Sequence, residues 1–480
     1  MNASRARTGP YLYLPIEVSA RELDAKLLIA SFAVNRGFEV VLGQKWLMQR
    51  NLASMPPGIV LFKTLTTRDA KAMRQAHAHG HRIAAIDEEV PGIVTRSEGL
   101  RWVFEGAVEQ ADVIFAVGEE HHETLVRRFP DFRHKFEVAG NPRWDLLRPE
   151  FVDSHAEEVA RIRAEFGPII LINTNLGLIN NAKGSPEQVV RTLERGGKVD
   201  RRRAADAAFF SEHGRLEEAS LAGIKALVPR LSGRFTGHTI IVRPHPGEKI
   251  KTWQDVIAGV PRAAMVQRGS AVPWILAADV LVHTYCTTGV EAFALGKPAI
   301  CFMPARSSLL DNYLSPRINF AAESTDDVIA RIAAILDTAP GAFAYPAEFH
   351  STFERSFEAW TGAFAAARIV DCLAHRFHVP QSPEAQRASW RPGRGYASAM
   401  RQKPHQRRVM PEMNSDEILG RLRRFGRSMS DALEFKIHPC GDRMFHVHRH
   451  AGEPDQLYQM PRPAWPARLF RWLPSAVSGG

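Results

Sequence analysis

The segment Ile240-Ile241-Val242-Arg243-Pro244-His245-Pro246 sets the fold class. Its apolar β-branched residues predict a buried strand, and a basic, proline-stiffened turn follows at once. Ligands of open α/β sheets bind beyond the carboxyl ends of the strands, so Arg243, His245 and Pro246 are candidate ligand contacts. His245 would donate a hydrogen bond to a phosphate oxygen. A structural His–Pro turn gives the same pattern, and a place beneath the turn also suits Arg243.

A second strand-to-helix junction lies at residues 280–296. The apolar run 280–283 predicts a strand, and a hydroxyl-rich loop then leads into a helix. Such a junction presents free backbone N–H groups and hydroxyls to a phosphate, so the loop residues are predicted to bind a nucleotide. They are Cys286, Thr287, Thr288 and Gly289. Glu291, in the first helical turn, would accept hydrogen bonds from ribose hydroxyls; it also fits an acid that complements the helix dipole.

The apolar run 168–173 predicts a further strand of the same sheet, and it ends in Asn173-Thr174-Asn175. The amides of Asn173 and Asn175 would hydrogen-bond a phosphate or a base, although asparagines in this place also form turns. The whole region 149–340 therefore reads as a Rossmann-like domain that binds a nucleotide donor. Its other expected strands are 239–242, 264–267 and 299–302.

The region 1–148 shows the same alternation of strands and helices, which is typical of βαβ units in a parallel sheet. It is predicted to be a Rossmann-like acceptor domain. The expected strands are 11–15, 38–43, 58–62, 82–87, 113–117 and 136–139, and the expected helices are 22–35, 67–79 and 119–129. The chain is thus predicted to be an α/β protein with two Rossmann-like domains facing a central cleft.

An acidic cluster, Asp87-Glu88-Glu89, stands at the end of one predicted strand of the first domain. Neighbouring carboxylates repel one another, which raises a pKa and suits one of them to take a proton from an acceptor hydroxyl. A solvated acidic loop is the alternative. Glu17 and Arg21 follow the first strand, where they would line the same cleft.

The C-terminal part of the chain divides into two regions. Residues 341–379 are expected to be helical, with a long stretch at 348–377 that braces the two domains. Residues 380–480 form a basic, Pro/Arg-rich extension that is expected to be partly disordered. It contains one predicted helix (415–429) and one predicted hairpin (433–448). From residue 381 onward, 17 Lys/Arg face 9 Asp/Glu, so this extension carries most of the net charge of +10.

Several classes of protein are disfavoured by what the sequence lacks. It has no apolar run of membrane-spanning length and no secretory signal, and its four cysteines form no CxxC pair. Motifs typical of P-loop kinases, dehydrogenases, zinc proteases and α/β-hydrolases are missing. No metal is expected, because the alternating His446, His448 and His450 lack an acidic or cysteine partner at a fixed spacing.

The basic extension predicts a partner with negative charge. Trp465, Leu469, Phe470 and Trp472 alternate with arginines, which favours docking on an anionic membrane surface. Nucleic acid is disfavoured, because the body of the protein has no basic stripe with interleaved aromatics. The expected location is the cytoplasm, on the inner face of the cytoplasmic membrane where the extension docks.

Taken together, these motifs resemble the bacterial surface carbohydrate biosynthesis protein family over about residues 10–375. The resemblance rests on six segments: Tyr13-Leu14-Pro15-Ile16-Glu17 with Arg21-Glu22, Asp87-Glu88-Glu89, Gly140-Asn141-Pro142-Arg143 with Asp145-Leu146-Leu147, Ile172-Asn173-Thr174-Asn175, Arg243-Pro244-His245-Pro246, and Cys286-Thr287-Thr288 with Glu291. The family resemblance implies a GT-B-like glycosyltransferase of surface polysaccharide biosynthesis.

Three of these segments also occur in the order seen in bacterial sialyltransferases and Kdo-type transferases. That distant resemblance implies a metal-independent transferase without a cofactor, moving an acidic sugar from a CMP-linked donor to a glycan acceptor such as capsule or lipopolysaccharide. Glu89 would match the general base, His245 the phosphate-binding histidine, and Thr287 and Thr288 the hydroxyl pair. Here the acidic cluster runs into Val90 and Pro91 instead of glycine, so Glu88 is the alternative base.

Three other functions fit the same fold. One is transfer of glycerol phosphate or ribitol phosphate from a cytidine diphosphate donor. Another is a sugar-nucleotide 2-epimerase, which acts without an acceptor. The third is a non-catalytic glycan-assembly factor, in which Glu89, His245 and Thr288 are only scaffold and no nucleotide binds.

Overall fold

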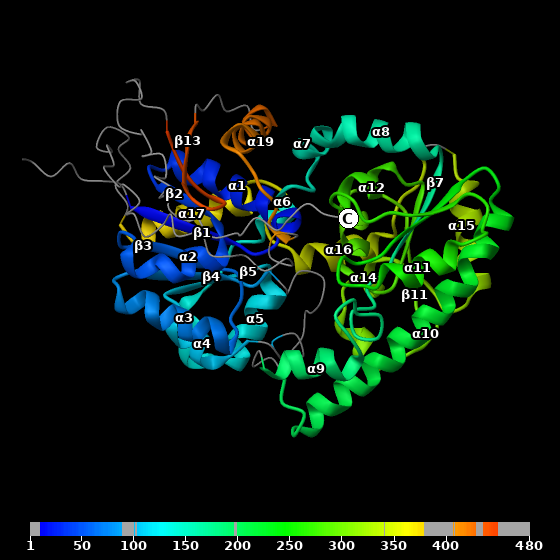
Figure 1. Ribbon diagram of the computed structural model, residues 1–480, viewed down its shortest axis with the longest axis horizontal. Coiled ribbons are helices and arrows are strands. Elements are labelled where there is room, and N and C mark those ends of the chain that lie inside the picture. Colours follow the sequence, from blue (N-terminus) through cyan, green and yellow to red (C-terminus); the bar gives the residue numbers. More distant parts are fainter. Residues whose placement is uncertain are drawn as a thin grey trace, which may run out of the picture.

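The computed structural model describes residues 10–88, 100, 103–195, 199–339, 341–378, 407, 409–428 and 435–449. Figure 1 shows two lobes side by side, the first in blue and cyan and the second mainly in green. Each lobe contains one sheet covered by helices, so the predicted α/β architecture with two Rossmann-like domains is confirmed. His450 and the aromatic segment 465–472 lie outside the described residues.

The first lobe is built on an eight-stranded sheet of order β13-β14-β2-β1-β3-β4-β5-β6. Its six N-terminal strands are parallel, as predicted. In sheet order the strands span Phe435–Gly441, Met444–Arg449, Glu39–Gln44, Tyr11–Ile16, Gly58–Phe62, Arg82–Ile86, Val113–Ala116 and Phe136–Val138.

The neighbouring strands β2, β1, β3, β4 and β5 are buried on both faces, which explains their largely apolar sequences. In β1 all six residues are buried. Leu12 and Leu14 pack into the core on one face, and Tyr11 and Tyr13 pack into the core on the other. Two complete helical layers are therefore needed to cover the sheet, and the chain supplies them between successive strands.

Part of the C-terminal extension belongs to this first sheet. The predicted hairpin is present as β13 and β14, and β14 pairs antiparallel with β2. The predicted helix is present as α19 (Ser415–Ser428), which packs on α1 (Ser19–Asn35). The hairpin covers the backbone edge of β2 that would otherwise be open to solvent. The predicted helix and hairpin of the extension thus lie within its described residues 409–428 and 435–449.

The second lobe contains a six-stranded parallel sheet of order β12-β11-β10-β7-β8-β9. The strand β12 was not predicted from the sequence. In sheet order the strands span Phe320–Ala322, Ala299–Phe302, Val280–His283, Ile169–Asn173, Thr239–Arg243 and Ala263–Met265.

Helices follow most of the strands in both lobes. Two of them begin with capping boxes, at Thr66–Asp69 and at Ser324–Asp327. These two are α3 (Thr67–Ala78) and α15 (Thr325–Leu336). The others among α2–α14 span Lys45–Asn51 (α2), Glu105–Gln110 (α4), Glu119–Arg128 (α5), Pro142–Asp145 (α6), Pro149–Val152 (α7), Ala156–Phe166 (α8), Pro186–Arg195 (α9), Ala204–Arg234 (α10), Ile250–Ile257 (α11), Val272–Ala277 (α12), Thr287–Ala294 (α13) and Ser315–Ile318 (α14).

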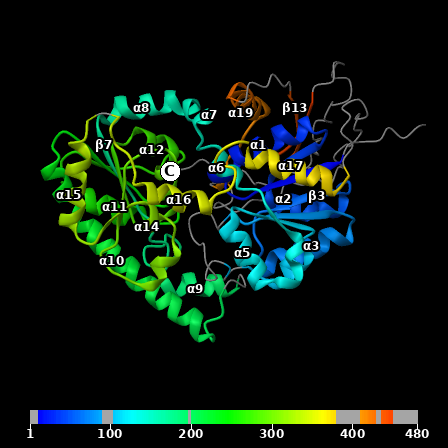
Figure 2. The same cartoon turned by 180° about the vertical axis from the view of Figure 1, so that it is seen from behind.

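The single helical stretch predicted at 348–377 is wrong. It is divided into α16 (Ala347–Ser356) and α17 (Ala365–Arg376) by a segment in which Ala359 and Gly362 have positive φ. Left-handed backbone conformations end a helix. The helix α16 contacts α5 of the first lobe and α14 of the second, whereas α17 packs on α1, as Figure 2 shows from behind.

The two lobes share one apolar cluster. It joins Val117, Trp144 and Leu147 of the first lobe to Val290 and Phe293 of α13 in the second. The α16 residues Phe353 and Phe357 complete it. Because both lobes bury side chains in one cluster, their relative placement is tied to the packing of α13. Within the described residues, no helix is long and apolar enough to cross a membrane.

Candidate functional site

Three polar residues lie side by side at the carboxyl ends of the central strands of the second sheet. Two of them, Asn173 and Arg243, were predicted as site residues, and the third is His283. Asn173 at the end of β7 lies in register between Arg243 of β8 and His283 of β10. Asn173 is buried, yet neither its amide oxygen nor its amide nitrogen has a hydrogen-bond partner among the described residues. Buried amides are normally paired, so these atoms indicate a place for a ligand or ordered water. Asn175, two residues further along the loop, is half-buried.

A hydrogen bond to the backbone fixes one edge of the Arg243 guanidinium. Its Nη2 atom donates to the carbonyl of Gly269 over 2.6 Å, whereas its buried Nε atom has no partner among the described residues. The sequence left a structural place and a ligand contact open for this arginine. The geometry allows both, because one edge of the guanidinium is fixed while another keeps its donor capacity.

The turn after β8 exposes His245 and Pro246 to solvent. The Nδ1 atom of His245 accepts a hydrogen bond from the backbone N–H of Gly247 over 3.1 Å. In the neutral ring, the proton must then sit on Nε2, which becomes a donor. This tautomer suits the predicted contact with a phosphate oxygen.

Sequence reasoning missed Glu248, which organises this turn. Its carboxylate is buried and accepts five hydrogen bonds, from the Thr174 hydroxyl, the Leu176 and His245 backbone N–H groups, the Asn180 amide and the Trp253 indole. Burial raises the pKa of Glu248, and these donors oppose that rise. The carboxylate thus joins the loop after β7 to the loop after β8. A glutamate directly after His-Pro-Gly was the only available sequence signal.

The predicted helix is present as α13, but it begins at Thr287, so Thr287, Thr288 and Gly289 belong to the helix and not to the loop before it. Thr287 and Thr288 occupy its first turn and are half-buried, and the thiol of Cys286 lies 2.8 Å from the Thr288 hydroxyl. Backbone N–H groups in the first turn of a helix have no partner within the helix. Burial raises the pKa of Cys286, so its thiol stays protonated and is a contact group instead of a nucleophile.

Gly289 has a steric role that its sequence context did not reveal. A Cβ atom at this position would lie 2.3 Å from Nε2 of His283 and 2.4 Å from Oδ1 of Asn319. Those two atoms are themselves 2.8 Å apart in a buried hydrogen bond. Burial lowers the pKa of His283 to about 4, which keeps the ring neutral. Gly289 therefore lets α13 approach the end of β10 closely.

Glu291 is buried in the second half of α13 and not in its first turn, where it was predicted. Its Oε1 atom lies 3.6 Å from Nη2 of Arg143, which belongs to the first lobe, while Oε2 is buried without a partner among the described residues. Burial raises the pKa of Glu291, and the charges of Arg143 and Arg243 oppose that rise. One oxygen of this carboxylate thus faces Arg143, and the other keeps its capacity to accept a hydrogen bond from a ligand.

At the carboxyl end of the first sheet, Glu17 and Arg21 join a network of buried charges. Nζ of Lys63 lies 2.7 Å from Glu22 and 3.0 Å from Glu17, and Arg21 lies 3.3 Å from Glu22. Burial would raise the pKa of Glu17, but the positive charges of Lys63 and Lys45 outweigh it and hold that pKa at about 2. The predicted pair of residues is thus brought together, and the lysines are the partners that sequence reasoning missed.

The acidic cluster after β4 is placed differently from the expectation. Asp87 and Glu88 are both buried, so a solvated loop is wrong for these two residues. Glu88 lies 2.7 Å from Nζ of Lys26, a cation that the sequence analysis did not connect with this cluster. Glu89, Val90 and Pro91 lie outside the described residues.

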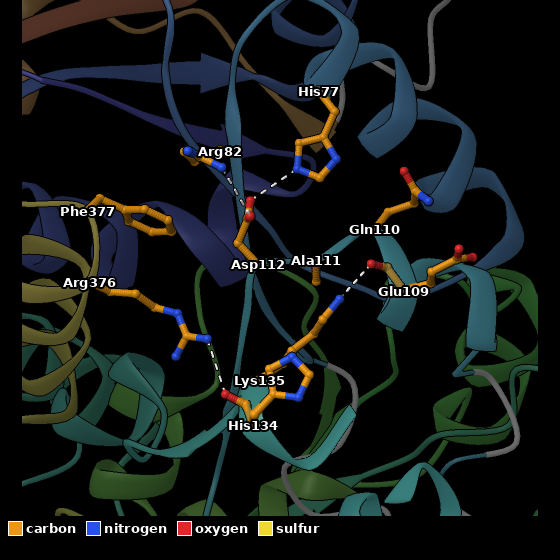
Figure 3. Close-up of a pocket in the computed structure, with 10 residues that line it drawn as sticks. All are labelled: His77, Arg82, Glu109, Gln110, Ala111, Asp112, His134, Lys135, Arg376 and Phe377. Atoms are coloured by element: carbon orange, nitrogen blue, oxygen red, sulfur yellow. Dashed lines mark hydrogen bonds and ion pairs between the residues drawn. The ribbon is translucent and has the colours of Figure 1, made fainter. Parts of the chain in front are cut away.

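A separate pocket of about 370 Å³ lies at the other end of the strands of the first sheet, away from Glu17 and Glu88 (Figure 3). Arg82 opens β4, Asp112 precedes β5 and Lys135 precedes β6, so the pocket borders the amino ends of these strands. Its polar groups are engaged with one another: Asp112 lies 3.0 Å from His77, and Arg376 donates to the His134 carbonyl. None of the predicted site residues lines this pocket. Across the described residues, no group of three or more metal-ligating side chains is present.

The fold of the chain is GT-B-like, with two Rossmann-like domains. One solved structure that shares it is a candidate UDP-N-acetylglucosamine 2-epimerase from Listeria monocytogenes, with a TM-score of 0.50 and 13% identity over 78% of this chain and 97% of that chain. Another is S. aureus MnaA in a co-structure with UDP, with a TM-score of 0.50 and 12% identity over 80% of this chain and 100% of that chain. No family model matches the chain, and no curated protein matches it in sequence.

Proposed function

We propose that the chain is a nucleotide-sugar enzyme of surface carbohydrate biosynthesis whose second domain holds the donor nucleotide. The observation that carries this proposal is a set of buried polar atoms of Asn173, Arg243 and Glu291 that have no hydrogen-bond partner within the described part of the chain. They stand at two adjacent strand ends and on the helix α13. This is where α/β sheets bind nucleotides, with phosphates at a helix N-terminus and carboxylates on the ribose.

The preferred reaction is glycosyl transfer of an acidic sugar from a CMP-linked donor, a choice supported by the sequence resemblance. The acceptor oxygen would attack the anomeric carbon while the bond to the phosphate oxygen breaks and CMP leaves with the electron pair. His245, Thr287 and Thr288 would stabilise the departing phosphate by hydrogen bonds. The acceptor proton would pass to the carboxylate of Glu88 or Glu89.

A 2-epimerase acting on a UDP-linked sugar is the second candidate. The two structures with a TM-score of 0.50 favour it, because one is described as a candidate enzyme of that class and the other as a complex with UDP. The same donor residues would serve both reactions. An epimerase needs no acceptor, so conversion of the sugar nucleotide alone would separate it from a transferase.

The deciding experiment is thermal unfolding of the full chain with CMP, CDP, UDP and the corresponding nucleosides. A ligand at a hundred times its Kd stabilises the folded state by about 2.7 kcal/mol. Strongest stabilisation by CMP supports the acidic-sugar transferase, by CDP the glycerol- or ribitol-phosphate transferase, and by UDP the epimerase. If none of the nucleotides stabilises the chain, the enzyme proposal fails and the scaffold alternative takes its place.

A further inference from the structure

An arginine of the first domain reaches the donor side of the second domain. Arg143 lies in α6, and its backbone N–H donates to the Asn141 side chain over 3.0 Å. Asp145, in the same short helix, accepts the N–H groups of Ala365 and Ala366 over 2.9 and 2.8 Å. These bonds fix the backbone that carries Arg143, so its guanidinium is directed by a rigid turn.

The partner of that guanidinium is Glu291 of α13. Nη2 and Oε1 are 3.6 Å apart, and the two side chains are only 18% and 12% exposed. Solvent screens partly buried charges less than exposed ones, so Arg143 acts on Glu291 more strongly than a surface arginine would. Burial raises the pKa of Glu291, and the positive charge of Arg143 opposes this rise more than that of Arg243 does.

The helix α13 is held to the same turn by apolar packing. Val290 and Phe293 flank Glu291 in sequence and pack in one cluster with Trp144 and Leu147, which follow Arg143. The contact between Arg143 and Glu291 is therefore set by a packed interface on both sides. Glu291 still has one buried oxygen, Oε2, without a partner among the described residues.

We propose that Arg143 is a positioning residue for the donor ribose, acting through Glu291 across the domain interface. It holds one oxygen of Glu291 and leaves the other, Oε2, oriented to accept hydrogen bonds from the ribose hydroxyls. The ribose subsite is then complete only when both domains contribute. This inference rests on the proposed function and adds a first-domain residue to the donor site.

The test compares nucleotides that differ only in the ribose hydroxyls. Binding of CMP, UDP and their 2′,3′-dideoxy counterparts is measured by calorimetry with wild type, Arg143→Ala and Arg143→Lys. We expect Arg143→Ala to weaken ribonucleotide binding by about tenfold, the scale of a hydrogen bond to a charged group, and to leave dideoxynucleotide binding within about twofold. Arg143→Lys keeps the charge and should recover part of the ribonucleotide affinity.

The matched control is Arg317→Ala. Arg317 of α14 lies 3.8 Å from Glu120 of α5, so its loss removes another ion pair between the lobes without touching Glu291. The preference for ribonucleotides should be unchanged in this variant. Equal losses for ribo- and dideoxynucleotides in Arg143→Ala would overturn the inference, as would the same change in preference in Arg317→Ala. A wild-type chain that binds neither CMP nor UDP would overturn the proposed function, and this inference with it.

Discussion

The carboxylate of Glu248 accepts the backbone N–H of His245 over 3.1 Å and the indole N–H of Trp253 over 3.0 Å. One buried side chain therefore fixes the turn that presents His245 and anchors it to α11. All five groups around this carboxylate are donors, so only an ionised acid satisfies them. The buried Glu248 therefore sets the geometry of the predicted phosphate contact at His245.

Replacing Glu248 by glutamine should destabilise the chain by about 2–4 kcal/mol, because the new NH₂ group would face donors in a buried site. The measurement is urea unfolding followed by circular dichroism. Glu354→Gln, at an exposed position of α16, is the matched control and should change stability by less than about 0.5 kcal/mol. Similar small changes in both variants would show that the Glu248 cluster is unimportant for stability.

Replacing His245 by alanine should reduce turnover by about 10²–10³-fold, the usual effect of losing one donor to a charged transition state. The fold should survive, because the side chain is exposed. Turnover is assayed with the donor that the thermal screen identifies, and unfolding is measured on the same sample. Unchanged turnover with that donor would contradict the assignment of His245 to the phosphate.

Replacing Gly289 by alanine should destabilise the chain by about 1–3 kcal/mol, because the added methyl group overlaps His283 and Asn319. Nucleotide binding should weaken as α13 moves. Gly233→Ala is the control: it lies in α10 with no atom near the added methyl, and alanine there should be neutral or stabilising by up to about 1 kcal/mol. An unaltered denaturation midpoint for Gly289→Ala would contradict the close approach of α13.

Much of the fold could be predicted because buried parallel strands have a simple sequence pattern. In the second sheet, the strands β7, β8 and β10 are short apolar runs. A polar residue marks the carboxyl end of each of them. Asn173 and Arg243 were located in this way, and their register in the sheet agrees. A helix after β10 was predicted for the same reason, although α13 begins within the predicted loop.

The missed features depend on contacts between residues that are distant in sequence. Arg143 and Glu291 belong to different domains, and the burial of Lys26, next to Glu88, is invisible until α1 is packed on the sheet. The tail hairpin could be predicted as a local pattern, but its pairing with β2 could not. Local periodicity also failed at 357–364, where Ala359 has a positive φ and its carbonyl accepts a hydrogen bond from the distant Arg148.

Acid should destabilise the chain between about pH 6.5 and pH 4. Burial lowers the pKa of His121 and of His283 to about 4, whereas an exposed histidine in the unfolded chain titrates near 6.5. In this interval unfolding takes up protons, so stability falls as pH falls. His121→Gln removes one titrating ring and keeps an acceptor for the Val117 N–H, so urea midpoints at pH 7 and pH 4.5 should differ less than in wild type. An equal difference would contradict this account of His121.

Removal of the tail hairpin should destabilise the first domain, although the predicted donor site lies in the second. A chain that ends at His378 loses the backbone partner of β2 and leaves the buried Glu39 without His446, whose Nε2 lies 2.6 Å from its carboxylate. Exposed strand edges promote association, and a buried charge without its partner is strongly destabilising. We expect the midpoint of thermal unfolding to fall by at least about 5 °C, with aggregation visible by light scattering.

The matched control for this deletion is a chain that ends at Arg449, which keeps β13, β14 and α19 and lacks only residues 450–480. Because the sheet edge stays covered, its unfolding midpoint should match that of the full chain. If the chain ending at His378 unfolded at the same temperature as the full chain and stayed monomeric, the hairpin would contribute nothing to the stability of the first domain. If both shortened chains lost stability equally, the effect would come from residues 450–480 and not from the pairing of β14 with β2.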